Sequence, residues 1–370
     1  MDDDIHKILV VGYSVRYIAC SGKRAGYEMH CIDHFNDLDL QNCGDVYPLG
    51  DIETEKDLKC FIDDHGIEFD AIILGSGFER FRLEGVVLNN ASKVMENVTN
   101  KRWLARRLEE LGVPHPQTYT TDYPQYPAIA KPIFGAGGVD ISLVYSENDL
   151  PQDDSFLLQE YISGMPASVS VISTKDEAVA VAVNEQIVGM KDLGQTFPFG
   201  YCGSITPFQT DFALKMCKIA EDIVLDLELI GTNGVDFILT EDDIFVIEVN
   251  PRFQATLDTI ELSTDINIFD AHLRAFNGDL IDKRDPYRFA AKSIVYTEEE
   301  FELRKDLRRE GILDITPVGT VVPKGDPVAT ATGVGTDREE ALSSMMENVF
   351  FIKGKIRKSS IENEDDGMSQ

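Results

Sequence analysis

Residues 234–252 read GVDFILTEDDIFVIEVNPR, and this stretch decides the fold. Two short apolar runs flank an acidic turn, which predicts a β-hairpin. Glu248 and Asn250 are two residues apart, so their side chains leave the same face of the second strand. When the strands pair, Asp236 lies across from them, with Arg252 just beyond. Two carboxylates and an amide oxygen suit Mg²⁺, which shares its remaining positions with water and phosphate oxygens.

The ordinary alternative for this hairpin is a solvated acidic face, which is common in acidic proteins. The position of the side chains argues against it. Glu248 and Asn250 interrupt an apolar strand, where a lone carboxylate is costly to bury without a cation or hydrogen bonds.

The composition restricts the partners. The chain has 370 residues, enough for two or three domains, with 34 Lys and Arg against 65 Asp and Glu, a net charge of −31. Nucleic acid and anionic membranes repel such a chain, and no basic patch compensates. We therefore expect neither a nucleic-acid partner nor a membrane partner.

The cysteines and the N-terminus indicate a cytoplasmic protein. None of the six cysteines forms a CxxC pair or a zinc-ligand pattern, so we expect reduced thiols. The segment Met1-Asp2-Asp3-Asp4 has the wrong charge for a signal peptide, and no apolar stretch is as long as a membrane span.

The N-terminal part has the pattern of a parallel α/β domain. Apolar runs at 7–13, 27–33 and 69–75 are separated by stretches with helical spacing. No GxGxxG follows the first run, which disfavours nicotinamide binding. Ligands bind beyond the carboxyl ends of parallel strands, so the segment Gly75–Glu79 is the best candidate site there, with a plain glycine loop as the alternative.

A lysine and a glycine loop follow each other in the middle of the chain. Lys131 lies within the apolar strand Ala128–Pro132, and Gly135, Gly137 and Gly138 come next. Such a loop lets backbone N–H groups approach phosphate oxygens, while the lysine supplies charge. A simple hairpin turn is the alternative, and the Walker pattern is absent.

Two further segments are candidates for the same site. The strand Phe156–Ile162 can offer backbone groups and one carboxylate to an adenine edge, although an edge strand with solvated ends has the same pattern. Residues 194–206 are rich in glycine and aromatic residues. They predict a mobile active-site loop, or an ordinary surface connection.

In this order, the segments resemble those of the ATP-grasp superfamily, and in particular its uncharacterised archaeal predicted ATP-dependent carboligases. The matching segments are Asn100-Lys101, Ala130-Lys131-Pro132, Gly135-Ala136-Gly137-Gly138, Gln159 to Gly164, Gly234 to Phe237 and Glu248 to Arg252. The segments 311–315 and 319–322 are similar to the small C-terminal cap of the biotin-carboxylase and aminoimidazole-carboxylase branch.

The resemblance implies a mixed α/β and α+β architecture. We expect an N-terminal parallel-sheet α/β domain at 1–96 and a two-lobed ATP-grasp domain at 97–285, with its lid lobe at about 115–185. A small C-terminal cap would follow at 286–354, with a helix from Arg338 to Asn348. The polar tail 355–370 is expected to be disordered, because it has little apolar surface to bury.

The resemblance also implies roles for individual residues. The residues carried over are Asp236, Glu248 and Asn250 for Mg²⁺ (or Mn²⁺), Lys101 and Lys131 for ATP phosphates, Gly135, Ala136, Gly137 and Gly138 for the lid loop over them, Glu160, Tyr161 and Ile162 for adenine, and Arg252 with Lys131 for catalysis. Many relatives place a second carboxylate on the ribose, where this chain has Ala167-Ser168. Ribose binding is therefore left open.

The function that the resemblance implies is a Mg-ATP-dependent ligase. ATP would activate a small-molecule carboxylate as an acyl phosphate, and a small-molecule amine would attack it. One alternative is a carboxylase-like enzyme that uses bicarbonate, and another is a non-catalytic ATP-binding protein. Relatives of this architecture are often dimers, so a homodimer is left open.

Overall fold

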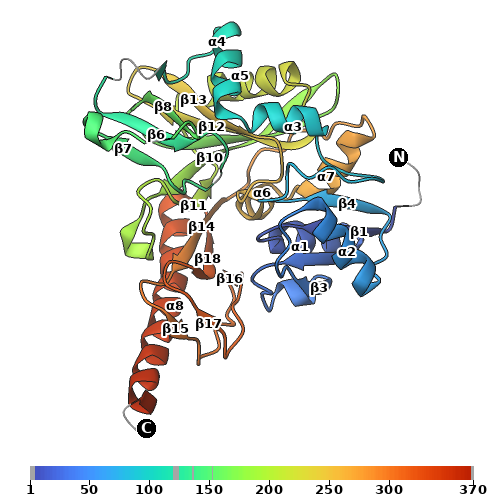
Figure 1. The fold of residues 1–370 in the computed structure, drawn as a ribbon, viewed down its shortest axis with the longest axis vertical. Helices are drawn as coiled ribbons and strands as arrows, with labels where there is room; N and C mark the ends of the chain where they lie inside the picture. The colour runs from blue at the N-terminus through green and yellow to red at the C-terminus, as the bar shows by residue number, and fades with distance from the viewer. Residues whose placement is uncertain (1–4, 120–124, 136, 152, 368–370) are drawn as a thin grey trace.

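The structure is a computed structural model that describes residues 5–119, 125–135, 137–151 and 153–367. Figure 1 shows the N-terminal domain beside a larger body built on one long sheet, with a small sheet at its upper left and a long C-terminal helix below. Across the described residues, no helix combines the length and apolarity needed to cross a lipid bilayer.

The N-terminal domain has the predicted parallel sheet. Its elements are β1 (Lys7–Val11), α1 (Arg16–Arg24), β2 (Glu28–Asp33), η1 (Leu40–Asn42), β3 (Asp45–Pro48), α2 (Glu55–His65) and β4 (Ala71–Leu74). The strand order is β3-β2-β1-β4, and all neighbours are parallel. Strands β1 and β4 are apolar throughout because both faces of a parallel sheet are covered.

Two helices and a small sheet come next. Helices α3 (Ser92–Val98) and α4 (Lys101–Glu110) precede the strands β5 (Thr118–Tyr119), β6 (Ala128–Pro132), β7 (Ser142–Val144) and β8 (Phe156–Glu160), with the turn η2 (Glu147–Asp149) between the last two. The Asn100 side chain caps α4 by accepting hydrogen bonds from the N–H groups of Arg102 and Trp103. The small sheet has the order β5-β8-β6-β7, and we call it the lid sheet.

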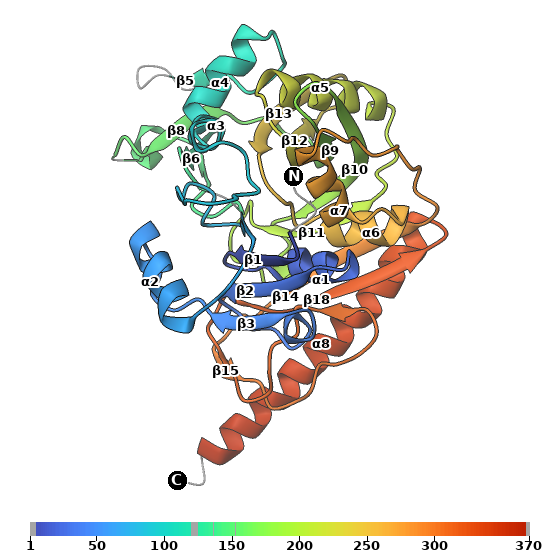
Figure 2. The ribbon, with the colours of Figure 1, turned by 90° about the vertical axis from the view of Figure 1, so that its right-hand side faces the viewer.

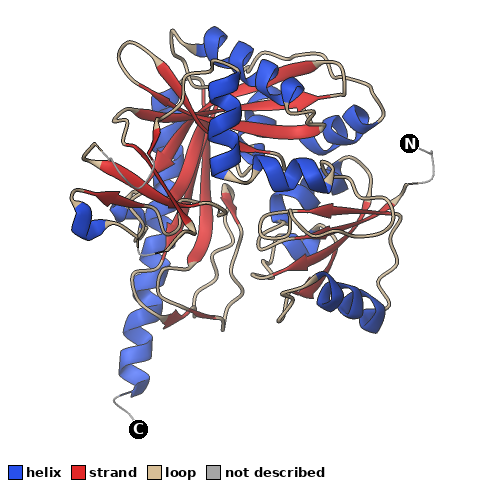
Figure 3. Ribbon diagram, turned by 45° about the horizontal axis from the view of Figure 1, so that its top comes forward, coloured by secondary structure: helices blue, strands red, loops and turns tan. Residues whose placement is uncertain are grey.

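The central sheet has eight antiparallel strands in the order β13-β12-β9-β10-β11-β14-β18-β16. Its elements up to the cap are β9 (Met165–Ser173), β10 (Ala178–Val188), η3 (Lys191–Leu193), β11 (Tyr201–Thr206), α5 (Ala213–Asp226), β12 (Gly231–Leu239), β13 (Ile244–Asn250), α6 (Leu257–Thr264) and α7 (Ile268–Phe276). Val169 and Val171 pack in one core with α5, and Ile172 packs in another with α7. The alternation along β9 therefore places helices on both faces of the sheet (Figure 3).

Two boundaries differ from the sequence prediction. The lid sheet ends at Glu160, whereas β9 and β10, which we assigned to a lid reaching about residue 185, lie in the central sheet. The cap elements are β14 (Phe289–Tyr296), β15 (Phe301–Glu302), β16 (Ile312–Leu313), β17 (Val321–Val322), β18 (Pro327–Gly335) and α8 (Arg338–Gly367). β11 pairs with β14, so the cap continues the central sheet. Sequence patterns do not reveal such pairing, because it depends on partners far apart in the chain.

The C-terminal tail also differs from the prediction. Helix α8 does not end at Asn348, and the expectation of disorder from residue 355 is wrong where the structure describes the chain, since α8 reaches Gly367. Buried contacts extend it, because Ile352 is fully buried and the Ser359 hydroxyl accepts a hydrogen bond from the Arg304 N–H. Figure 2 shows α8 crossing β14 and β18 and continuing beyond them.

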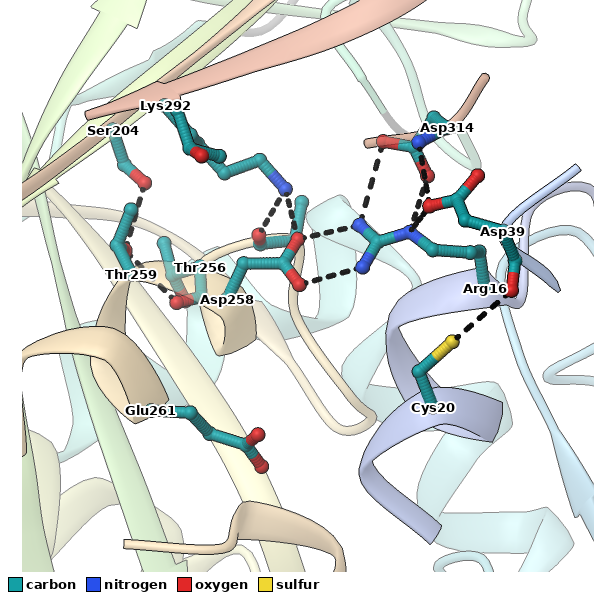
Figure 4. Close-up of polar contacts among 12 residues, drawn as sticks. Arg16, Cys20, Asp39, Ser204, Thr256, Asp258, Thr259, Glu261, Lys292 and Asp314 are labelled. Atoms are coloured by element: carbon teal, nitrogen blue, oxygen red, sulfur yellow. Dashed lines mark hydrogen bonds and ion pairs between the residues drawn. The ribbon is translucent and has the colours of Figure 1, made fainter. Parts of the chain in front are cut away.

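One buried ion cluster joins the three parts of the molecule (Figure 4). The Arg16 guanidinium of α1 donates to both carboxylate oxygens of Asp258 on α6, at 2.8 and 2.7 Å, and to Asp314 of the cap at 2.7 Å. Lys292 of β14 also contacts Asp258, at 2.8 Å. Burial raises the pKa of Asp258, but the charges of Arg16 and Lys292 outweigh it and hold that pKa well below its ordinary value.

The prediction that every cysteine is a reduced thiol is wrong for two of the six. Cys20 of α1 and Cys43 after η1 form a disulfide, with their Cα atoms 4.9 Å apart. Cys31, Cys60, Cys202 and Cys217 are free. The pair escapes sequence rules because the β2–β3 connection folds back onto α1.

We expect the disulfide to stabilise the N-terminal domain. Replacing Cys20 by Ser should lower the free energy of unfolding by about 2–4 kcal/mol, because the closed loop no longer restricts the unfolded chain. Thermal unfolding without reductant measures the change, with the exposed free Cys60→Ser as the matched control. Equal melting temperatures for the two variants would contradict the expectation.

Candidate active site

The hairpin β12–β13 brings Asp236, Glu248 and Asn250 together, as the sequence predicts. Asp236 lies directly opposite Glu248 in the antiparallel register. The Asn250 side-chain amide donates to one oxygen of Asp236 at 2.9 Å, and Gln186 of β10 donates to the other at 2.9 Å. The hairpin thus brings the three side chains together, and their assignment to a metal stays a prediction.

Two buried lysines face this carboxylate pair from different elements. The Lys101 ammonium at the start of α4 lies 3.1 Å from the Glu248 carboxylate and donates to the Gly135 carbonyl at 2.7 Å. Lys131 of β6 is 4% exposed, and its charge interacts with those of Glu248 and Lys101. The lid sheet and the central sheet therefore contribute opposite charges to one site.

The burial of these groups shifts their pKa values in opposite directions. Burial and the neighbouring charge of Glu248 raise the pKa of Asp236 to about 7, against the hydrogen bonds from Asn250 and Gln186. Burial lowers the pKa of Lys131 to about 8, with Lys101 acting in the same direction and Glu248 opposing it. A carboxylate that is costly to ionise beside a second carboxylate is an environment that a divalent cation relieves.

The donor set fits Mg²⁺ better than a metal held by protein ligands alone. Among the described residues, no group of three or more His, Cys, Asp or Glu side chains is arranged to hold a metal. An ion at the hairpin would have two carboxylates and an amide oxygen from the chain, and water and phosphate would complete its shell, as they do for Mg²⁺ in nucleotide sites.

We expect Mg²⁺ affinity to depend on pH in a defined direction. The cation needs Asp236 ionised, so apparent affinity should fall as the pH decreases below about 7, approaching about tenfold per pH unit, and level off above about pH 8. Calorimetric titration with MgCl₂ at pH values below 7 and at about pH 8 measures the dependence. In Asp236→Asn the dependence should disappear, whereas a flat profile in the unmodified protein would contradict the role of Asp236.

Arg252 connects the hairpin with the N-terminal domain. Its guanidinium Nε lies 2.7 Å from the Glu79 carboxylate, in the loop after β4. It also donates to the Phe253 carbonyl at 2.9 Å. The segment Gly75–Glu79 therefore lies beside the candidate site, but its link to Arg252 was not predicted.

The glycine loop contacts Lys101 and the segment that leads into β11. Gly137 and Gly138 have φ values of 70° and 77°, which disfavour other residues, and a Cβ on Gly138 would lie 1.9 Å from the Phe199 carbonyl oxygen. The Gly137 carbonyl accepts a hydrogen bond from the Tyr201 N–H at 3.2 Å. Ala136, assigned to this loop, lies outside the described residues.

The residues assigned to adenine lie at the far end of the lid sheet. Glu160 ends β8 opposite Ala128 of β6, whereas Lys131 lies three residues further along β6. Three strand residues span about 10 Å, so an extended nucleotide can reach from one to the other. Tyr161 and Ile162 follow Glu160 and are half-buried. The Glu160 carboxylate accepts a hydrogen bond from the Gln117 N–H, and its adenine role stays a prediction.

Sequence reasoning missed Gln186 and misjudged one loop. Gln186 belongs to the polar run Asn184-Glu185-Gln186 inside an apolar strand, a signal that points to a buried polar site. Of the segment 194–206, residues 201–206 form β11 of the central sheet, so only the part before Tyr201 is a connection.

A cavity of about 830 Å³ lies away from this cluster. Its lining comes from α1, α6, β18, α8 and nearby loops, and includes Arg16 and Asp258. The candidate active site is therefore identified by the charged side chains that meet at the β12–β13 hairpin, and not by this cavity.

Comparison with known proteins identifies the middle of the chain. Residues 98–256 match the ATP-grasp domain family. An uncharacterized protein of Methanocaldococcus jannaschii is 26% identical over 371 residues, covering 93% of this chain and 91% of that protein. The resemblance to the ATP-grasp superfamily is thereby confirmed.

Solved structures share the fold across nearly the whole chain. One is the biotin carboxylase domain dimer of Hydrogenobacter thermophilus 2-oxoglutarate carboxylase, in complex with magnesium ADP and bicarbonate, with a TM-score of 0.75, 15% identity and coverage of 93% of this chain and 89% of that chain. Another is phosphoribosylamine–glycine ligase from Thermotoga maritima, with a TM-score of 0.71, 17% identity and coverage of 94% and 96%. At these identities the likeness concerns the fold.

Proposed function

Because residues 98–256 are an ATP-grasp domain, and ATP-grasp enzymes use ATP with Mg²⁺, we propose that this protein is a ligase that joins a carboxylate to an amine. The observation that carries the proposal is the convergence of Lys101 and Lys131 on the hairpin carboxylates, with Lys101 also bound to the glycine loop at the Gly135 carbonyl. Such an arrangement suits phosphoryl transfer, which needs charge neutralisation and alignment more than covalent help from the protein.

The proposed reaction has two steps. A carboxylate oxygen of the substrate attacks the γ-phosphorus of ATP, and the bond to the leaving ADP breaks. The amine nitrogen then attacks the acyl carbon, the acyl C–O bond breaks, and phosphate and a proton leave. Asp236, Glu248 and Asn250 would hold Mg²⁺, which would supply positive charge to the phosphate oxygens.

The residues of the chain bind, orient and exclude water. Lys101 and Lys131 balance the charge of the phosphates, and the glycine loop covers them. Arg252, oriented by Glu79, steadies the phosphoryl group in transfer. Closure of the lid keeps water from the acyl phosphate, which water would otherwise hydrolyse.

A phosphate-release screen tests this proposal. Purified protein with Mg-ATP is incubated with pooled carboxylates and pooled amines, and new products are identified by mass spectrometry. We expect phosphate release that requires both pools, together with a product in which the two are joined. Binding of ATP without phosphate release from any pool would favour a non-catalytic nucleotide-binding protein.

Bicarbonate as the carboxylate is the second candidate. The fold likeness to a biotin carboxylase domain extends across 93% of the chain, cap included, and motivates it. Incubation with ¹³C-bicarbonate separates the two, since only this candidate incorporates label into the product.

A further inference from the structure

The loop after β4 contacts the chain at two places, just after the β12–β13 hairpin and just after strand β6 of the lid sheet. We call residues Gly75–Arg80 the β4 loop. Glu79 forms an ion pair with Arg252 at 2.7 Å. The next residue, Arg80, places its guanidinium carbon 4.6 Å from the ring centroid of Phe134, immediately before the glycine loop. Two consecutive side chains of the N-terminal domain thus hold two different parts of the candidate active site.

The β4 loop is anchored firmly enough to serve as a support. Phe78 is 5% exposed and packs in the core of the N-terminal domain, where its ring lies 5.0 Å from that of Phe81. The Tyr13 N–H donates to the Ser76 carbonyl at 3.0 Å, and the Gly77 N–H donates to the Glu79 carboxylate at 2.9 Å. These contacts fix the backbone from which Glu79 and Arg80 project.

The lid side of the contact is lightly held. Phe134 is 38% exposed, and the glycine loop beyond it is anchored by Lys101 at the Gly135 carbonyl and by the Tyr201 N–H at the Gly137 carbonyl. Both anchors lie within the ATP-grasp part of the chain. The contact of Arg80 with Phe134 joins this end of the loop to the N-terminal domain.

We propose that Arg80 is a positioning residue that seats the glycine loop on the β4 loop and so couples lid closure to the loop that orients Arg252. The inference rests on the proposed function and adds to it a positioning role for Arg80. A molecule that binds at the β4 loop, where the second substrate of a parallel-sheet domain is expected, then favours the closed lid through the same residues.

If Arg80 no longer holds the glycine loop, water should reach the acyl phosphate more often. An acyl phosphate survives only while the closed lid excludes water, so a loosely seated loop should release phosphate without forming product. Loss of an exposed cation–π contact changes a closing equilibrium by about two- to fivefold. Uncoupled hydrolysis, rather than a loss of fold, is therefore the expected defect.

Hydrogen exchange on the full chain tests the contact without knowledge of the substrates. The probe is a non-hydrolysable ATP analogue with Mg²⁺, and the reporter is the amide exchange of peptides covering Lys131–Gly135. In the unmodified protein we expect the analogue to slow this exchange. In Arg80→Gln the added protection should fall by about two- to fivefold, and Arg80→Lys should retain most of it because the cation remains.

Arg82→Gln is the matched control, because Arg82 is exposed on the same segment and pairs with Glu96 at 3.4 Å. Its protection should equal that of the unmodified protein. Phe134→Leu, which removes the ring but keeps an apolar side chain, should reproduce the effect of Arg80→Gln. Equal protection in Arg80→Gln and Arg82→Gln would overturn the coupling and leave the proposed function standing.

Absence of analogue-dependent protection in the unmodified protein would overturn the coupling. Absence of analogue binding in a separate calorimetric titration would overturn the proposed function as well. Once substrates are known, the ratio of phosphate released to product formed gives a second readout. It should rise in Arg80→Gln and fall back in Arg80→Lys, which a purely structural role would not produce.

Discussion

Replacing Glu248 by Gln is expected to reduce Mg-ATP-dependent phosphate release by at least about 100-fold, since even an outer partner of a metal ligand is worth about 10- to 100-fold in affinity or activity. The substitution keeps the shape of the side chain. It removes one of the two facing carboxylates and the partner of Lys101. Phosphate release at saturating Mg-ATP measures the loss.

Glu241→Gln is the control for this prediction, because Glu241 lies exposed in the turn of the same hairpin. It should leave turnover unchanged. Far-ultraviolet circular dichroism should be the same for both variants, since Glu248 is partly exposed and contributes no apolar core. A Glu248→Gln protein with ordinary turnover would show that the metal assignment is wrong.

The second large effect is expected at the ion cluster that joins the three parts of the molecule. Replacing Arg16 by Met should lower the free energy of unfolding by about 3–5 kcal/mol, because buried carboxylates lose their cation. Asp258 keeps Lys292, but Asp314 loses its bonds to the guanidinium. Urea unfolding followed by fluorescence of the single tryptophan, Trp103, measures the change.

Arg24→Met is the matched control on the same helix. Arg24 pairs with Glu261 but is largely exposed, and exposed pairs contribute about 0–1 kcal/mol. Equal destabilisation by the two variants would contradict the importance of the buried cluster. Because the folded pKa of Asp258 is depressed, the contribution of Arg16 should be complete above about pH 4 and be lost only as the pH falls through that folded pKa.

The candidate site could be predicted largely because its residues are close together in the sequence. Glu248 and Asn250 share a strand face, and the hairpin turn places Asp236 opposite them. Strand periodicity and turn chemistry are local properties. The contributions of Gln186 and Glu79 could not be predicted in this way, because β10 and the β4 loop reach the hairpin from distant parts of the chain.

The corrections have the same origin. The Cys20–Cys43 disulfide, the continuation of the central sheet through β14 and the extension of α8 all depend on contacts between distant segments. Composition suggested reduced thiols and a disordered tail, and the resemblance suggested a small cap without showing its pairing with β11, because each segment was judged without its partner.

The sequence by itself determined the parallel N-terminal sheet, the hairpin with its three oxygen-bearing side chains, and the lysine that precedes the glycine loop. Hydrophobic periodicity and glycine placement act over a few residues, so they can be recognised in the sequence alone. Only the tertiary structure decided which side chains of other elements would meet them. Lys101 against Glu248, Arg80 against Phe134 and Arg16 between Asp258 and Asp314 arise when burial brings distant charges into a medium where they must be paired.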